Sequence, residues 1–141
     1  MKSLVILLVM VGFGQSAIHQ FRSMINCACT RSATDFNGYG CHCGRGGSGD
    51  WVDNIDRCCK YHDDCWDALE EGDCSNDDPL LEYYTFSQTG CGYRPNINCE
   101  DSSNNDCERG VCRCDRAAAF CFRAYEASFD TCYENYDKST C

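Results

Sequence analysis

A histidine with two carboxylates beside it, His62-Asp63-Asp64, has the residue types for chemistry. Imidazole accepts and releases protons near neutral pH, and a neighbouring carboxylate can bind a cation. Cysteines at 58, 59 and 65 surround the three residues, and disulfides there would hold them in place. A buried histidine paired with a carboxylate is often only part of a satisfied core, so this segment alone does not establish a catalytic site.

A glycine-rich segment could supply further ligands for a cation. Residues 41–49, the glycine loop, read Cys-His-Cys-Gly-Arg-Gly-Gly-Ser-Gly. Glycine adopts positive φ and leaves its carbonyl unhindered, and Ca²⁺ prefers about six to eight oxygen ligands, which can include carbonyls and a carboxylate. Such loops usually only turn the chain, and this one lacks the Gly-Lys-Ser/Thr ending of a phosphate loop. Together with Asp63, the loop favours a calcium site.

Two long helices are predicted to position these residues, one over residues 52–71 and one from about 106 to 129. Each contains two cysteines seven residues apart, about two helical turns, which therefore line one face. These are Cys58 and Cys65 in the first helix, and Cys114 and Cys121 in the second. Facing positions of antiparallel helices have a constant sum of residue numbers, and 58 with 121 and 65 with 114 both give 179. Two disulfides would fit this register, although sequence alone does not fix the pairing.

The same register brings His62 near Asp115. Their residue numbers sum to 177, within one helical turn of the register, so a hydrogen bond between the helices is geometrically reasonable.

Near the N-terminus, Ile18, Phe21 and Ile25 recur at helical spacing and predict a short amphipathic helix, whose apolar stripe would ordinarily face the core. Between the long helices, β-favouring residues at 83–86 and turn residues at 90–98 predict a short hairpin.

The first sixteen residues have the pattern of a secretory signal peptide. Lys2 precedes an apolar run from Leu4 to Val11, and small residues follow it. A retained N-terminal anchor is the alternative interpretation. Cleavage after Ser16 would leave residues 17–141, a length that favours one domain. No later stretch approaches the roughly 20 apolar residues of a bilayer-spanning helix, so no transmembrane segment is expected.

The sixteen cysteines all follow the proposed cleavage point and predict a disulfide framework in an oxidising compartment. A zinc site is a weaker reading, because Cys58 and Cys59 are adjacent and paired C-x2-C spacings are lacking.

The chain carries 12 basic and 22 acidic residues, a net charge of −10. Removal of Lys2 leaves 11 against 22, or −11. Nucleic acid is therefore not an expected partner.

Three segments carry a family resemblance when they are taken in order. They read Tyr-Gly-Cys-His-Cys-Gly-Arg-Gly-Gly at 39–47, Asp-Arg-Cys-Cys-Lys-Tyr-His-Asp-Asp-Cys at 56–65, and Cys-Arg-Cys-Asp-Arg-Ala-Ala-Ala-Phe-Cys at 112–121. Together they closely resemble the secreted phospholipases A2 of the pancreatic and elapid type, known as group I, and the resemblance extends over residues 17–141. It implies a mainly α, disulfide-rich fold. The expected parts are two long antiparallel helices, an N-terminal helix, a calcium loop and a short two-stranded β-wing.

The resemblance implies a calcium-dependent enzyme that hydrolyses the sn-2 acyl ester of glycerophospholipids to lysophospholipid and free fatty acid. His62 would activate water, and Asp115 would orient the His62 ring. Four residues would hold Ca²⁺, three through backbone carbonyls and the last through its carboxylate: His42, Gly44, Gly46 and Asp63. The ion and the N–H of Gly44 would stabilise the developing oxyanion.

The resemblance also implies roles for residues around this centre. Four would form a supporting hydrogen-bond network: Trp66, Tyr84, Ala17 and Gln20. Trp66 replaces a tyrosine usual in the family, and its indole N–H can still donate to Asp115. Ala17 would act through the free α-amino group of the mature chain. Four apolar residues would line the acyl-chain channel: Ile18, Phe21, Ile25 and Phe122.

Seven disulfides follow from the same resemblance: Cys27–Cys91, Cys41–Cys141, Cys43–Cys59, Cys58–Cys121, Cys65–Cys114, Cys74–Cys107 and Cys99–Cys112. Cys29 and Cys132 lie outside the family's common set. An eighth bridge between them is expected, and an intermolecular bridge is the alternative.

The chain is therefore predicted to be secreted and extracellular, with phospholipid aggregates or a membrane surface as its partner. A different class of function uses the same scaffold, namely a non-catalytic phospholipase-like toxin, receptor ligand or matrix protein. Such proteins commonly lose the calcium aspartate or the catalytic histidine. Asp63 and His62 are both present, which favours the enzyme.

Overall fold

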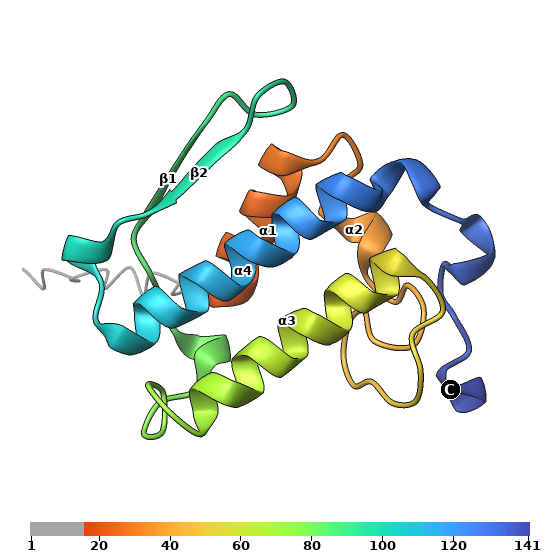
Figure 1. Ribbon diagram of the computed structural model, residues 1–141, viewed down its shortest axis with the longest axis horizontal. Helices are drawn as coiled ribbons and strands as arrows, with labels where there is room; N and C mark the ends of the chain where they lie inside the picture. The colour runs from red at the N-terminus through yellow and green to blue at the C-terminus, as the bar shows by residue number, and fades with distance from the viewer. Residues whose placement is uncertain (1–15) are drawn as a thin grey trace, which may run out of the picture.

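A computed structural model describes residues 16–141, so the predicted signal peptide lies, apart from Ser16, outside the described residues. Figure 1 shows helices arranged side by side with a hairpin projecting at one edge. The helices are α1 (Ala17–Ala28), α2 (Ala33–Phe36), α3 (Asn54–Glu70) and α4 (Asp106–Tyr125). Short 3-10 turns lie at Pro79–Leu81 (η1), Asp101–Ser103 (η2), Glu126–Ser128 (η3), Thr131–Tyr133 (η4) and Lys138–Thr140 (η5).

Polar caps set where the two long helices begin. The Asp53 side chain accepts a hydrogen bond from the Asp56 N–H at 2.9 Å and caps α3. Asn105 and Glu108 form a reciprocal capping box at the start of α4. The predicted helices are confirmed with small changes at their ends: α3 spans 54–70 rather than 52–71, and α4 ends at Tyr125, where the chain tightens into η3.

The long helices α3 and α4 are antiparallel and are joined in the predicted register. Disulfides Cys58–Cys121 and Cys65–Cys114 connect them about two turns apart. The other five predicted disulfides are present as well. Since the two interhelical bridges lie on either side of position 62, they fix that part of α3 against α4.

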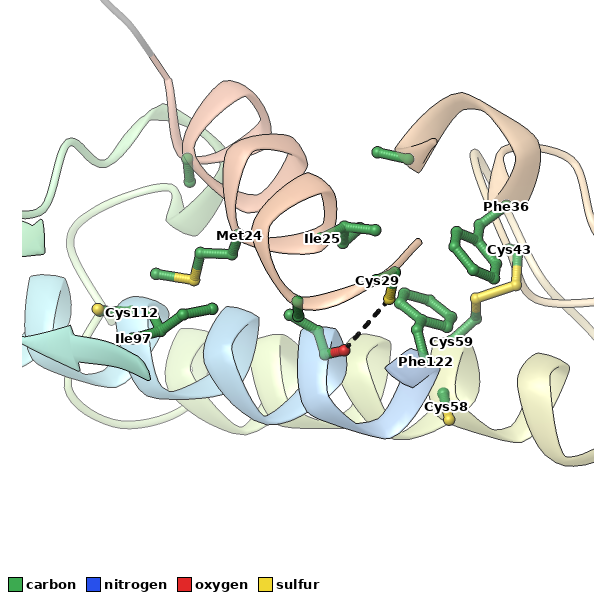
Figure 2. Packing of buried hydrophobic residues seen from close by; sticks show 14 of the residues in the cluster. Met24, Ile25, Cys29, Phe36, Cys43, Cys58, Cys59, Ile97, Cys112 and Phe122 are labelled. Carbon is green, nitrogen blue, oxygen red and sulfur yellow. Dashed lines mark hydrogen bonds between the residues drawn. A yellow bond between two sulfur atoms is a disulfide. The ribbon is translucent and has the colours of Figure 1, made fainter. Parts of the chain in front are cut away.

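The hydrophobic core lies where α1 and α2 pack on α4 (Figure 2). Met24 and Ile25 of α1 are at most 5% exposed, and the ring of Phe36 in α2 stacks on that of Phe122 in α4 at 4.5 Å. Ile97, from β2, belongs to the same buried cluster as Met24 and is labelled with it in Figure 2. The apolar stripe of α1 is therefore partly core.

Strands β1 (Phe86–Thr89) and β2 (Asn96–Cys99) pair antiparallel, with Phe86 opposite Cys99. The Cys27–Cys91 disulfide ties the end of this hairpin to α1. The predicted architecture of long antiparallel helices, N-terminal helix, loop and β-wing is thus confirmed. Among the helices of residues 16–141, we find none with the length and apolar character needed to cross a bilayer.

The eighth disulfide expected between Cys29 and Cys132 is wrong, because both cysteines are free. Cys29 is buried at the end of α1, and its thiol donates to the Ala119 carbonyl of α4 at 3.8 Å, as the dashed line in Figure 2 shows. Cys132 is exposed in η4. A disulfide requires Cβ atoms only about 3.5–4.5 Å apart, and the even number of cysteines carried no information about that geometry.

Candidate functional site

The centre of the candidate site is a hydrogen bond between the two long helices. Nε2 of His62, on α3, lies 2.6 Å from Oδ1 of Asp115, on α4. The side chain of Asp115 is fully buried, and that of His62 is 10% exposed. Because Nε2 faces the carboxylate, Nδ1 is the ring nitrogen left for another partner. The pairing expected from the helix register is therefore present.

Three donors converge on the Asp115 carboxylate. Besides His62, the indole N–H of Trp66 donates to Oδ1 at 3.1 Å, and the hydroxyl of Tyr84 donates to Oδ2 at 2.7 Å. Burial raises the pKa of Asp115, whereas the hydrogen bonds from His62, Tyr84 and Trp66 act in the opposite direction. Both carboxylate oxygens are thus occupied, and the group is held in one orientation.

Aromatic rings hold the His62 imidazole on its other sides. The ring of Phe21, on α1, stacks on it almost in parallel, with centroids 4.2 Å apart and planes 11° apart. The ring of Trp66 lies 4.7 Å from it. Phe21 in turn lies 6.3 Å from Phe122. These contacts exclude water from much of the imidazole and fix the direction of Nδ1.

The predicted supporting network is linked through Tyr84. The Gln20 amide donates to the Tyr84 carbonyl at 2.5 Å and accepts from the Tyr84 N–H at 3.0 Å. Tyr84 then reaches Asp115 through its hydroxyl. Ala17, three residues before Gln20, is fully buried at the start of α1. Gln20 and Tyr84 therefore connect α1 to the His62–Asp115 pair.

The four predicted channel residues do not share one environment. Phe21 is partly buried and contacts His62, and Phe122 is 2% exposed behind it. Ile25 is 5% exposed and belongs to the core, whereas Ile18 is 51% exposed at the surface. The structure thus places one member of the stripe at the surface, one beside His62 and one in the core.

A cavity of about 400 Å³ lies against α3 and the glycine loop. All four predicted calcium ligands line it: His42, Gly44, Gly46 and Asp63. Trp66 lines it too, and its ring is adjacent to that of His62. The proposed cation site and the histidine pair are therefore neighbours along one side of α3.

The glycine loop can adopt its shape because of its glycines. Gly44 and Gly46 have φ of +91° and +75°, values that other residues rarely adopt. Among the backbone hydrogen bonds of turns and loops within residues 16–141, none has the Gly44 N–H as its donor. An unbonded donor at the cavity wall is what an oxyanion requires.

Asp63 has the character of a cation ligand. Burial raises the pKa of its carboxyl, with smaller contributions from neighbouring Asp67 and Asp64 in the same direction and from His62 and His42 in the other. Within residues 16–141, Asp63 takes part in neither a salt bridge nor a hydrogen bond that would compensate the buried charge. A half-buried carboxylate beside glycine carbonyls fits a hard cation such as Ca²⁺.

A second buried aspartate binds the start of the glycine loop and the segment that follows its other end. Asp56 is fully buried on α3, and its carboxylate accepts from the N–H groups of Cys41 at 2.9 Å, His42 at 2.7 Å and Val52 at 2.9 Å. A β-carbon on Gly40 would lie 2.4 Å from Asp56 Cγ, so only glycine fits there. Asp56 therefore fixes this part of the chain to α3.

The C-terminal segment supports the loop from another side. The Lys138 ammonium donates to the carbonyls of Cys41 and Cys43, both at 3.1 Å, which flank the carbonyl of His42. The Cys41–Cys141 disulfide joins the same two segments. The His42 ring also lies 3.0 Å from the Gly49 carbonyl through Nε2, which closes the loop internally.

Reasoning from the sequence did not assign roles to Asp56 or Lys138. Asp56 did carry a signal, because it lies three residues before Cys59 and so falls on the same side of α3 as that buried cysteine. Lys138 carried none, since its partners are backbone carbonyls almost a hundred residues away.

Comparisons with known proteins agree with this geometry. Residues 18–134 match the phospholipase A2 family. The chain is 46% identical over 125 residues to "Basic phospholipase A2" of Micrurus corallinus, covering 86% of this chain and 78% of that protein. It is 40% identical over 144 residues to "Phospholipase A2" of Bos taurus, covering 95% and 94%. It is 47% identical over 105 residues to "Basic phospholipase A2 2" of Bungarus caeruleus, covering 74% and 72%. The chain belongs to the phospholipase A2 family.

Proposed function

We propose that this protein is a secreted, calcium-dependent phospholipase A2 that hydrolyses the sn-2 acyl ester of glycerophospholipids to lysophospholipid and free fatty acid. The observation that carries the proposal is the His62–Asp115 pair beside a cavity that contains the unpaired carboxylate of Asp63. The family's named relatives support the reaction class, and seven disulfides support an extracellular location.

In this mechanism, Nδ1 of His62 takes a proton from a water molecule as its oxygen attacks the sn-2 carbonyl carbon. Asp115 keeps the Nε2–H directed at itself and stabilises the imidazolium that forms. The N–H of Gly44 donates to the carbonyl oxygen as negative charge develops there. The imidazolium then returns the proton to the leaving glycerol oxygen, which releases the fatty acid and lysophospholipid.

Calcium would be held by the carbonyls of His42, Gly44 and Gly46 and by the Asp63 carboxylate. Bound there, Ca²⁺ would supply positive charge to the substrate phosphate and the oxyanion. Asp56 and Lys138 would keep those carbonyls in place through the contacts described above. No residue of the chain needs to form a covalent acyl-enzyme.

The lipid interface would meet the surface near the start of α1. Ile18 is 51% exposed there, and η1, which packs against α1, presents Leu81 at 71% exposure. Apolar side chains at the surface can enter the boundary of a lipid aggregate. Removal of the predicted signal peptide after Ser16 would leave Ala17 as the first residue of α1.

Fatty-acid release from mixed micelles tests the proposal. His62→Gln should keep calcium binding and lower turnover by at least roughly 10²- to 10⁴-fold, the usual contribution of general-base catalysis. Asp63→Asn should weaken calcium binding, measured by calorimetry, and lower turnover with it. His19→Gln, an exposed histidine of α1, is the matched control on dispersed lipid.

Full activity in excess chelator would contradict the calcium requirement. Near wild-type turnover in His62→Gln with calcium bound would make His62 merely structural. If the wild-type protein released no fatty acid with calcium present, the alternative function of a non-catalytic protein on this scaffold would be favoured.

A further inference from the structure

Basic side chains gather on one face of α4. Four arginines are spaced so that they return to the same side of a helix. They are Arg109, Arg113, Arg116 and Arg123, and we call them the arginine stripe. Phe120 lies on the same face, between the last two. At about 1.5 Å of rise per residue, the stripe extends roughly 21 Å along the helix.

This face of α4 has no exposed carboxylate to balance the arginines. Between Glu108 and Glu126 the one acidic residue is Asp115, and it is fully buried. Residues 50–82, which include α3, contain twelve acidic residues and two basic ones. Charge is therefore segregated in the molecule. The acidic residues responsible for the net charge of −10 are concentrated in the segment that includes α3, whereas α4 presents cations to solvent.

The arginines of the stripe differ in how far their charge is already compensated. Arg109 and Arg113, near the start of α4, form salt bridges with Asp106 and Asp101. Arg116 is exposed and takes part in none of the salt bridges found within residues 16–141. The middle of the stripe is therefore the part most available to an anionic partner.

The end of the β1–β2 hairpin extends this cationic surface. The Arg123 guanidinium donates to the carbonyl of Tyr93 at 3.3 Å, which holds the hairpin end against the stripe. The next residue, Arg94, is exposed, forms none of those salt bridges and lies 5.5 Å from the centroid of the Tyr93 ring. In the same way, the Arg116 guanidinium lies 5.7 Å from the centroid of the Phe120 ring. The surface thus combines free guanidinium groups with aromatic rings, and Tyr93 is 79% exposed.

The chemistry of this surface suits a narrow, extended polyanion. Guanidinium groups bind the oxygens of sulfate and phosphate groups through paired hydrogen bonds. Aromatic rings offer apolar contact to sugar rings. An anionic membrane is flat and would meet the repulsion of the whole chain, with its net charge of −10. A single polysaccharide chain can follow the stripe and remain away from the acidic residues of α3.

We propose that the arginine stripe, together with Arg94, is a binding surface for a sulfated polysaccharide. This inference goes beyond the proposed function, because it requires neither calcium nor catalysis; the proposed secretion is what would bring the protein to extracellular polysaccharides. None of the stripe residues lines the cavity that contains Asp63. The protein could therefore hydrolyse lipid while it is bound to the polysaccharide.

Calorimetric titration with a heparin oligosaccharide tests the inference. The full mature protein is used with calcium present at an ionic strength of about 0.15 M. A hyaluronan oligosaccharide of the same length is the comparison probe, because it carries carboxylates but no sulfate. The wild-type protein should bind heparin more tightly than hyaluronan. Its heparin affinity should decrease as salt is raised, because binding of a polyanion to cations releases condensed counterions.

Three double variants locate the binding surface. Arg94→Glu/Arg116→Glu should raise the dissociation constant for heparin by at least roughly a hundredfold, since loss of each charge-assisted contact costs about a factor of ten. Arg94→Gln/Arg116→Gln removes charge without reversing it, guards against misfolding of the first variant, and should give a smaller increase of roughly tenfold. Arg45→Glu/Lys60→Glu is the control, because it alters net charge as much as the first variant but lies on the glycine loop and α3. Its heparin affinity should remain close to that of the wild type.

Four results would overturn the inference. The first is the absence of heparin binding by the wild-type protein, and the second is equal affinity for hyaluronan. The third is an equal loss of affinity in the control variant, since net charge would then explain the effect. The fourth is retention of heparin binding in both Arg94/Arg116 variants; if these variants instead lost binding to phosphatidylglycerol vesicles, the surface would be a membrane contact.

The inference and the proposed function can fail separately. Fatty-acid release from dispersed lipid is measured on the same protein samples. If the wild-type protein releases no fatty acid but binds heparin through the stripe, the proposed function fails and the inference stands. If it hydrolyses lipid and does not bind heparin, the inference fails and the proposed function stands.

Discussion

Asp56→Asn tests whether one buried carboxylate holds the glycine loop. The native carboxylate accepts three backbone N–H groups: Oδ2 binds those of Cys41 and Val52, and Oδ1 binds that of His42. Asparagine has one acceptor oxygen and one amide group, so at least one N–H would face another donor. Asp56 is fully buried, and water cannot replace the lost partner without opening the site.

The magnitude follows from these three bonds. A hydrogen bond to a charged group contributes about 1.5–3 kcal/mol, and a buried donor left unpaired costs about 1–3 kcal/mol. Loss of one bond, with weaker retention of the other two, should lower the free energy of unfolding by about 2–4 kcal/mol. Release of Cys41 or His42 would also loosen the loop, so calcium affinity should fall by roughly tenfold or more.

Urea unfolding in chelator measures the first effect, and calorimetric titration with calcium measures the second. Asp73→Asn is the matched control, because Asp73 is exposed just beyond α3 and a surface change of this kind usually alters stability by within about 0.5 kcal/mol. If Asp56→Asn unfolded with the same free energy as this control and bound calcium like the wild type, the role assigned to Asp56 would be refuted.

Three further predictions concern the chain ends and the thiols. Two extra residues before Ala17, which is fully buried, should slow hydrolysis of micelles far more than of dispersed lipid; equal micellar rates would exclude a role for the mature N-terminus. Maleimide should label one thiol, Cys132, in the folded protein and two thiols after unfolding without reductant, because Cys29 is buried and burial raises its pKa to about 12. If no thiol reacted in either state, a disulfide between Cys29 and Cys132 would again be the better interpretation. Lys138→Met should weaken calcium binding by about threefold to tenfold, since two charge-assisted hydrogen bonds to the loop are lost, and Lys138→Arg should recover part of the affinity. An unchanged dissociation constant for calcium in Lys138→Met would contradict a role of Lys138 in holding the loop.

Much of the architecture could be predicted because it follows from local periodicity and from residue spacing. The seven-residue interval between Cys58 and Cys65 is a property of one helix, and matching it to a second helix gave the antiparallel register. The His62–Asp115 contact followed from that register. Helix ends were less predictable: η3 continues α4 as a tighter turn, and a distinction between i+3 and i+4 bonding is not visible in residue types.

The features that could not be predicted depend on where side chains far apart in sequence meet. Cys29 is directed at an α4 carbonyl, and Cys132 lies exposed on η4, so counting cysteines gave the wrong pairing. Lys138 bonds to carbonyls, which every residue possesses, and no residue type marks them as its partners.

The contacts of α1 connect the two halves of the proposed enzyme, lipid capture and ester hydrolysis. Gln20 holds the Tyr84 backbone through two hydrogen bonds, and the Tyr84 hydroxyl holds Asp115, which orients His62. Phe21, the next residue of α1, stacks directly on the His62 ring. A displacement of α1 would therefore disturb the imidazole through its ring face and its carboxylate partner at once. Since α1 also carries the exposed Ile18, the surface proposed to meet lipid and the general base are positioned by one helix.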